Sequence, residues 1–98
     1  MKKVVRPQSL QILWERRKQI DLIDDKLLSL LNQRLSIALE IGKIKKERRE
    51  KIYNPKREDE ILKRLNLINR GPLKEEDLKK IFKKIMRVCR KSQNLMPR

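Results

Sequence analysis

The sequence predicts an all-α protein built from three helices, of which the first is much longer than the others. Only two glycines, four prolines and three aromatic residues occur among 98 residues, and 42% of the chain is charged. Apolar residues recur every three or four positions, which is the period of an amphipathic helix rather than of a strand. The length fits one domain over residues 1–98, with loose ends expected at 1–8 and 94–98.

The first predicted helix runs from about Ser9 to Arg48. No proline interrupts it, and Gly42 is its only glycine. The almost wholly charged segment 46–51 indicates its end or a loop. The apolar residues that recur with the period of a helix are Ile20, Ile23, Leu27, Leu30, Leu31, Ala38 and Ile41.

Two shorter helices follow. Asn54 and Pro55 are typical of an N-cap and a first helical position, so the second helix is expected from Pro55 to about Asn69. Gly71 and Pro72 end it. The third helix is expected from about Lys74 to Gln93, with Leu78, Ile81, Phe82, Ile85 and Cys89 on one side.

The length of the first helix predicts a dimer. A helix of about 40 residues is about 60 Å long, whereas a compact chain of this size has a radius of gyration of about 13 Å. The two shorter helices cannot cover its whole apolar face. A second copy, related by a two-fold axis, is the most economical cover.

Composition limits the classes of function. Lys and Arg number 28 against 13 Asp and Glu, a net charge of +15 that favours anionic partners: nucleic acid, acidic lipid or a small polyanion. Cys89 is the only cysteine and histidine is absent, so an intrachain disulfide is excluded and a metal site is not expected. Neither a signal peptide nor a membrane span of about 18 apolar residues is evident, which predicts a soluble, cytoplasmic protein.

Polar residues interrupt the apolar faces at four positions. Arg34 and Lys45 continue the spacing of Leu27, Leu31, Ala38 and Ile41, so they face the same way as the core. Glu58 shares the face of Ile61 and Leu62, and Gln93 extends the face of Cys89. Buried charges are costly unless they are paired or bind a ligand. The four residues together indicate a polar pocket for an anion, but Arg34 and Lys45 could instead pair with Glu58 or extend to solvent.

Arg17 cannot serve the same pocket from the same helix. It precedes Arg34 by 17 residues, which is about 25 Å along the helix axis. Across a two-fold dimer it could reach the pocket of the partner. The alternative is an ordinary surface arginine next to Arg16 and Lys18.

These residues form an ordered set that resembles a known family. The motifs are Arg17-x-x-Ile20-Asp21-x-Ile23-Asp24, Ala38-x-x-Ile41-Gly42-x-x-Lys45, Asn54-Pro55-x-Arg57-Glu58 and Cys89-x-x-x-Gln93. Together they are similar to the all-helical, AroQ-type chorismate mutases over nearly the whole chain. The resemblance implies an intertwined homodimer of three-helix protomers that converts chorismate to prephenate, for phenylalanine and tyrosine synthesis, without metal or cofactor.

The resemblance also implies residue roles. Arg17, from the neighbouring protomer, and Arg34 are expected to bind the substrate carboxylates. Lys45 is expected to contact a carboxylate and the ether oxygen, and Gln93 the same ether oxygen. Glu58 corresponds to the acceptor of the ring hydroxyl. Asn54, through its backbone, and Arg57 line that end of the pocket, whereas Cys89 replaces a serine of some members or is simply a small buried side chain.

Three other functions are compatible with parts of the sequence. Isochorismate pyruvate lyase shares the scaffold and a similar arginine and lysine set, but Arg57, Glu58 and Gln93 favour the mutase. A basic nucleic-acid-binding dimer fits the charge and leaves the inward-facing polar residues unexplained. A purely structural helical bundle has no use for a polar pocket. With 98 residues, we expect a monofunctional enzyme without a fused domain.

Overall fold

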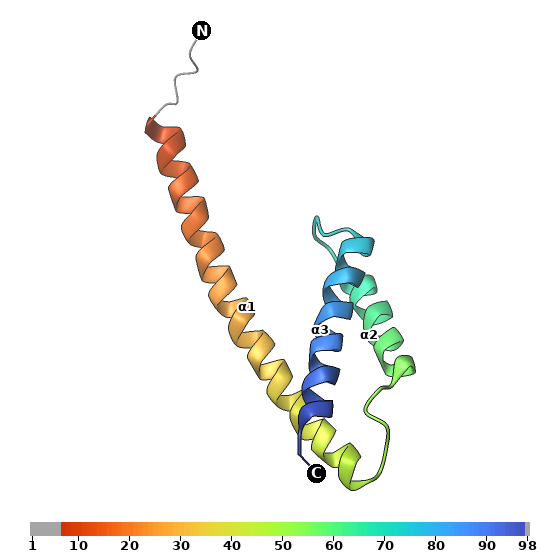
Figure 1. Ribbon diagram of the computed structural model, residues 1–98. Helices are drawn as coiled ribbons and strands as arrows, with labels where there is room; N and C mark the ends of the chain where they lie inside the picture. Colours follow the sequence, from red (N-terminus) through yellow and green to blue (C-terminus); the bar gives the residue numbers. More distant parts are fainter. Residues whose placement is uncertain (1–6, 98) are drawn as a thin grey trace. The chain divides into compact units, whose positions relative to one another are not determined.

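The computed structural model describes residues 7–97, which form three α-helices and no strand. They are α1 (Pro7–Glu47), α2 (Pro55–Ile68) and α3 (Glu75–Leu95), shown in Figure 1. The all-α prediction with a long first helix is confirmed. Of the expected loose ends, residues 7, 8, 94 and 95 are helical, and residues 1–6 and 98 lie outside the described part.

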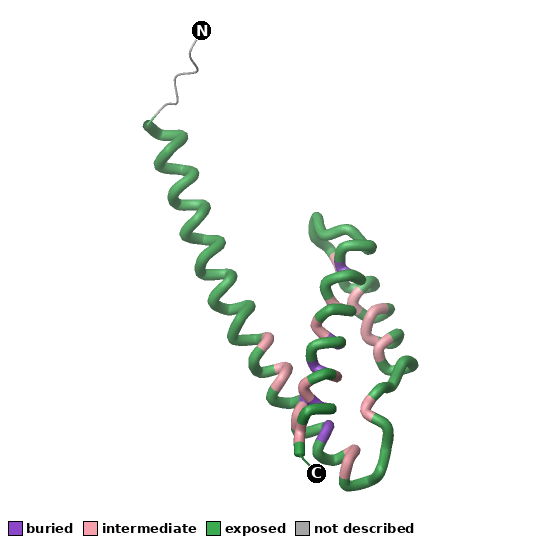
Figure 2. The backbone as a smooth tube through the Cα atoms, viewed as in Figure 1, coloured by how far each residue is buried: buried purple, intermediate pink, exposed green. Residues whose placement is uncertain are grey.

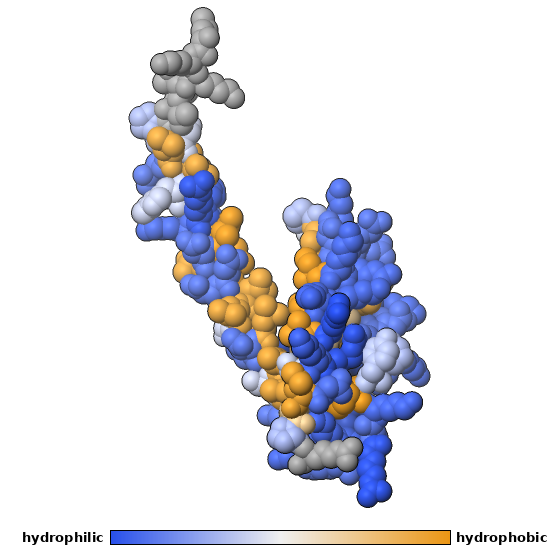
Figure 3. Space-filling view, in the orientation of Figure 1, coloured by the Kyte–Doolittle hydropathy of each residue, from blue (hydrophilic) through white to orange (hydrophobic). Residues whose placement is uncertain are grey.

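The chain divides into two units, Met1–Arg34 and Leu35–Arg98, and α1 contributes to both. The described part of the first unit is helix alone, and only Leu31 and Arg34 in it are even half-buried. Figure 2 shows this stretch as almost continuously exposed, and Figure 3 shows apolar side chains along it. Its exposed large apolar residues include Leu10, Leu13, Trp14, Ile20, Ile23, Leu27 and Leu30.

The second unit contains residues 35–47 of α1 together with α2 and α3. In Figure 1, α2 and α3 lie side by side and run in opposite directions. The buried apolar residues are Ala38 on α1 and Leu78, Met86 and Cys89 on α3. We expected Ile81 on this side of α3, but it is 47% exposed and Met86 is buried instead.

Specific hydrogen bonds define where α1 ends and where α2 begins. The α1 helix ends in a Schellman motif, in which the backbone N–H groups of Arg49 and Glu50 donate to the carbonyl oxygens of Lys46 and Lys45 at 3.1 and 2.8 Å. Arg49 accordingly has a positive φ of 57°. The α2 helix begins as predicted, because the side-chain oxygen of Asn54 accepts a hydrogen bond from the backbone N–H of Arg57 at 3.0 Å.

Candidate functional site

The predicted site residues are distributed over both units. Arg17, which is exposed, and Arg34, which is half-buried, belong to the first unit. The other six belong to the second unit: Lys45, Asn54, Arg57, Glu58, Cys89 and Gln93. The geometry below therefore concerns the second unit.

The side chain of Gln93, on α3, is hydrogen-bonded to the backbone of α1. The residue is 7% exposed, and its Nε2 donates to the carbonyl oxygen of Ala38 at 2.6 Å. The prediction that Gln93 extends the buried face of α3 is confirmed. Only the amide nitrogen can face a carbonyl oxygen, so this bond fixes the orientation of the amide and leaves its second N–H for another acceptor.

Gly42 permits this close approach. A Cβ atom at this position would lie 2.9 Å from the Cγ atom of Gln93 and 2.9 Å from the Cε atom of Met96. Such distances are shorter than any ordinary carbon contact, so only glycine leaves room for the side chains of α3 here. The glycine in the motif that begins at Ala38 thus has a packing reason.

Lys45 lies one turn further along α1 and is half-buried. Its Nζ donates to the backbone carbonyl oxygen of Ile52 at 3.0 Å, which ties the segment after α1 back onto the helix. An ammonium group has three N–H donors, so two remain for a ligand. The alternative in which Lys45 pairs with Glu58 is not what the structure contains.

Glu58 instead pairs with Arg90, a residue that the sequence analysis missed. Nη1 of Arg90 donates to both carboxylate oxygens of Glu58. The guanidinium carbon of Arg90 also lies 4.6 Å from the centre of the Tyr53 ring. The available signal was position: Arg90 precedes Gln93 by three residues and so lies at the edge of the same face of α3.

The remaining three predicted residues differ in their surroundings. Asn54 uses its side-chain oxygen as the cap of α2, and its carbonyl oxygen accepts from Glu58 N–H at 3.1 Å. Arg57 is exposed, and its Nη1 lies 4.0 Å from Oε2 of Glu60, which makes this a weak surface pair. Cys89 is buried one turn before Gln93.

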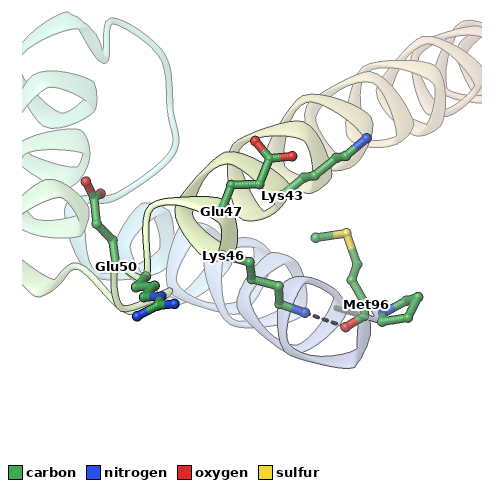
Figure 4. Close-up of a pocket in the computed structure, with 7 residues that line it drawn as sticks. Lys43, Lys46, Glu47, Glu50 and Met96 are labelled. Carbon is green, nitrogen blue, oxygen red and sulfur yellow. Dashed lines mark hydrogen bonds between the residues drawn. The ribbon is translucent and has the colours of Figure 1, made fainter.

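A hollow at the end of α1 does not coincide with these residues. It is lined by Lys43, Lys46, Glu47, Arg49, Glu50, Met96 and Pro97. Figure 4 shows the Lys46 side chain reaching the carbonyl oxygen of Met96 within it. None of the predicted site residues lines this hollow, and its cations and carboxylates are mixed.

Two further findings concern the described residues as a whole. Nowhere in residues 7–97 do three or more histidine, cysteine, aspartate or glutamate side chains gather as metal ligands would. Within the same residues, the helices lack the long uncharged apolar stretch that a membrane span needs. On the exposed surface of α2, the hydrogen bond from the Lys63 ammonium to Asp59, at 2.9 Å, raises the pKa of Lys63 above its ordinary value.

Comparison with known proteins gives one consistent family. Residues 16–94 match the family model described as chorismate mutase type II. The chorismate mutase (form II) structure from Thermus thermophilus is similar, with 31% identity, a TM-score of 0.84, and coverage of 88% of this chain and 98% of that one. The Helicobacter pylori chorismate mutase structure in complex with prephenate has 42% identity, a TM-score of 0.80, and coverage of 86% and 91%.

A longer relative aligns with the same region. The bifunctional chorismate mutase/prephenate dehydratase of Neisseria gonorrhoeae is 37% identical over 79 residues, which cover 81% of this chain. The chain spans about a fifth of the length of that relative, 21% of it. The resemblance noted in the sequence is therefore supported by a family model, by folds and by curated sequences alike.

Proposed function

The chain belongs to the chorismate mutase type II family, and from this premise we propose that it rearranges chorismate to prephenate. The observation that carries the proposal is the buried amide of Gln93, fixed by Ala38 and given room by Gly42. A buried amide with one oriented N–H left over has the chemistry to bind an oxygen that gains negative charge. Gln93 occupies the position at which the family resemblance predicts a hydrogen-bond donor to the ether oxygen of the substrate.

The reaction is an intramolecular [3,3] rearrangement in which one C–O bond breaks as one C–C bond forms. No proton is transferred and no covalent intermediate is formed with the protein.

The step requires the flexible side arm of chorismate to fold over its ring. We assign the two substrate carboxylates to Arg34 and to Arg17 of the neighbouring protomer, because the planar guanidinium fork matches a carboxylate. Such orientation is worth about 7–11 kcal/mol in well-aligned intramolecular reactions.

Lys45 and Gln93 supply the electrostatic part of the proposal. As the C–O bond breaks, negative charge grows on the ether oxygen. Donors aimed at that oxygen bind the transition state more strongly than the substrate, which raises kcat. By analogy with oxyanion holes, one such donor contributes about 3–4 kcal/mol. The two free N–H groups of Lys45 allow contact with a carboxylate and with the ether oxygen together.

The start of α2 is assigned to the ring end of the substrate. Glu58 accepts a hydrogen bond from the ring hydroxyl, and the exposed guanidinium of Arg57 borders the same end. The oxygens of Asn54 are both used in the first turn of α2, so its backbone N–H is the group we assign to the substrate. Cys89 contributes shape to the pocket, as a small buried side chain on the same helix as Gln93.

The active form in this proposal is a homodimer. The exposed apolar residues of the first unit, such as Leu13, Ile20 and Leu27, are 46%, 57% and 51% exposed. A row of large apolar side chains on a helix surface favours association. A second copy would cover this row and bring its Arg17 to the site. We also propose a cytoplasmic location, in keeping with a chain whose single cysteine cannot form an intrachain disulfide.

The test is the loss of chorismate absorbance with purified protein and no added metal or cofactor, with prephenate identified as the product. Isochorismate is assayed in parallel, and release of pyruvate from it reports the lyase. Saturable formation of prephenate supports the proposal. Pyruvate formation from isochorismate, without prephenate from chorismate, would replace it with the lyase. A folded dimer that is inactive on both substrates contradicts it.

A further inference from the structure

Arg90, Glu58 and Tyr53 form a cluster that joins α3 to the start of α2. Arg90 donates from one nitrogen, Nη1, to both oxygens of the Glu58 carboxylate. The side chains of Arg90 and Glu58 are only 28% and 20% exposed, which is far less than those of the surface ion pairs of α2. The face of the Tyr53 ring lies against the guanidinium. Each of the three side chains is therefore fixed by another.

We propose that Arg90 is a positioning residue, which holds the Glu58 carboxylate in the orientation that receives the ring hydroxyl of chorismate. This inference rests on the proposed function. It adds Arg90 and Tyr53 to the residues on which recognition of the substrate depends. Neither residue is required to touch the substrate.

The chemistry of the three groups supports this role. A glutamate side chain has three rotatable bonds, and a contact to both of its oxygens removes that freedom before the substrate arrives. Each carboxylate oxygen has two lone-pair directions, so one contact from Arg90 leaves each oxygen able to accept another hydrogen bond. A half-buried carboxylate also needs a compensating positive charge, which Arg90 supplies.

Tyr53 acts on the other side of the cluster. A guanidinium stacks on an aromatic face, and that of Arg90 does so on the Tyr53 ring at the surface, where the tyrosine is 56% exposed. The ring thereby limits where the Arg90 head can lie, and Arg90 limits where Glu58 can lie. A lysine would reproduce the arrangement only in part, because its ammonium group can donate to the carboxylate but has no flat face to stack on the ring.

The experiment measures kcat and KM for chorismate in Arg90→Met, Glu58→Gln and the double variant. A contact that is already present in the bound substrate affects KM more than kcat. We expect each single variant to raise KM about tenfold, within the range seen for coupled polar contacts. Because Arg90 acts through Glu58, the double variant should be no worse than the single ones.

Conservative and control variants separate positioning from simple stability. Arg90→Lys should raise KM less than Arg90→Met does. If Arg90→Met does not fold, the KM of Arg90→Lys tests the role of Arg90 instead. Tyr53→Phe keeps the ring and should behave as wild type, whereas Tyr53→Leu should raise KM. Arg87→Met removes an exposed arginine from the same helix and should leave KM unchanged. Unfolding temperatures are measured for all variants.

The outcomes distinguish the two proposals. If wild-type protein does not convert chorismate, the proposed function and this inference are both wrong. If wild type is active and Arg90→Met and Arg90→Lys keep its KM, only the role of Arg90 is overturned, even where the unfolding temperature falls. Effects of Arg90→Met and Glu58→Gln that multiply in the double variant would also overturn it, because they would show independent action.

Discussion

The amide nitrogen of Gln93 donates a hydrogen bond of 2.6 Å to the carbonyl oxygen of Ala38, on the opposite helix. The contact is buried, and it joins residues that are 55 positions apart in the sequence. It requires a donor at the end of side chain 93. The same geometry leaves one N–H of the amide for the substrate, so packing and the proposed catalysis demand the same chemical group.

Gln93→Glu should therefore be active only at low pH. An ionised carboxylate would face the Ala38 carbonyl oxygen in a buried place, so burial and repulsion raise the pKa of the introduced group. Below that pKa the neutral acid has one O–H donor where the amide has two N–H groups, so it can donate to the substrate or to Ala38 and activity recovers in part. Activity falls as the pH rises through that pKa. Stability is lost as the pH rises from the pKa of the unfolded state to that of the folded state, because over this interval the folded state binds the proton more tightly. The measurements are kcat against pH and the unfolding temperature against pH, with wild type as the reference; parallel profiles would contradict the assignment.

Gly42→Ala should lower both stability and turnover. Alanine gains about 1 kcal/mol over glycine inside a helix, whereas overpacking a close contact costs about 1–3 kcal/mol. The crowded atoms include Cβ of Gln93 at 3.1 Å, which is attached to the backbone of α3 and cannot swing away. We expect a net loss of about 1 kcal/mol, from the difference of these two effects.

The matched control is Gly71→Ala, because nothing lies within 4 Å of a Cβ atom at that position. This variant should be as stable as wild type or slightly more so, since alanine reduces the freedom of the unfolded chain. Chemical denaturation and turnover of both variants make the comparison. Equal behaviour of the two would mean that Gly42 does not set the position of Gln93.

Much of this arrangement was predictable from the sequence because it follows from local periodicity. The spacing of apolar residues predicted all three helices, and Asn54 with Pro55 predicted the first residue of α2. The buried position of Gln93 followed from its spacing with Cys89. These signals depend on helical geometry and capping alone, so they survive without knowledge of tertiary contacts.

The sequence did not predict the features that depend on contacts between helices. Arg90 resembles any other cation in a basic helix, and its partner Glu58 lies 32 residues away. Arg49 gave no sign of a positive φ, since glycine or asparagine usually occupies that place. The carbonyl oxygen of Ile52 as the partner of Lys45 was equally hidden, because any backbone carbonyl can accept.

Lys45→Ala should reduce kcat by about a hundredfold or more, the effect of removing a donor from a developing oxyanion. The protein should remain folded.

Lys45 also has a structural role, because its ammonium group donates to the carbonyl oxygen of Ile52. Lys45→Gln separates this role from the catalytic one. Its neutral amide can still donate to that carbonyl oxygen but lacks the charge, so activity should stay low while stability recovers. Lys43→Ala, at an exposed position of the same helix, is the control. Near-normal turnover of Lys45→Ala would remove Lys45 from the mechanism.

The shared site is tested by mixing two inactive variants. Arg17→Ala and Arg34→Ala should each lose most activity, because each removes a carboxylate contact. In a mixed dimer one site carries both substitutions and the other carries neither, if Arg17 serves the site of the partner. A statistical mixture contains half of its dimers in the mixed form, so about a quarter of all sites regain full function, given the two-fold arrangement.

The mixed dimer can also be isolated directly, from differently tagged chains that are exchanged under mild denaturant and purified through both tags. Its turnover should be about half that of wild type. If these doubly tagged dimers are as inactive as either parent, Arg17 does not complete the site of the partner. That result would remove Arg17 from the site altogether, because about 25 Å of one continuous helix separates it from Arg34 of the same chain.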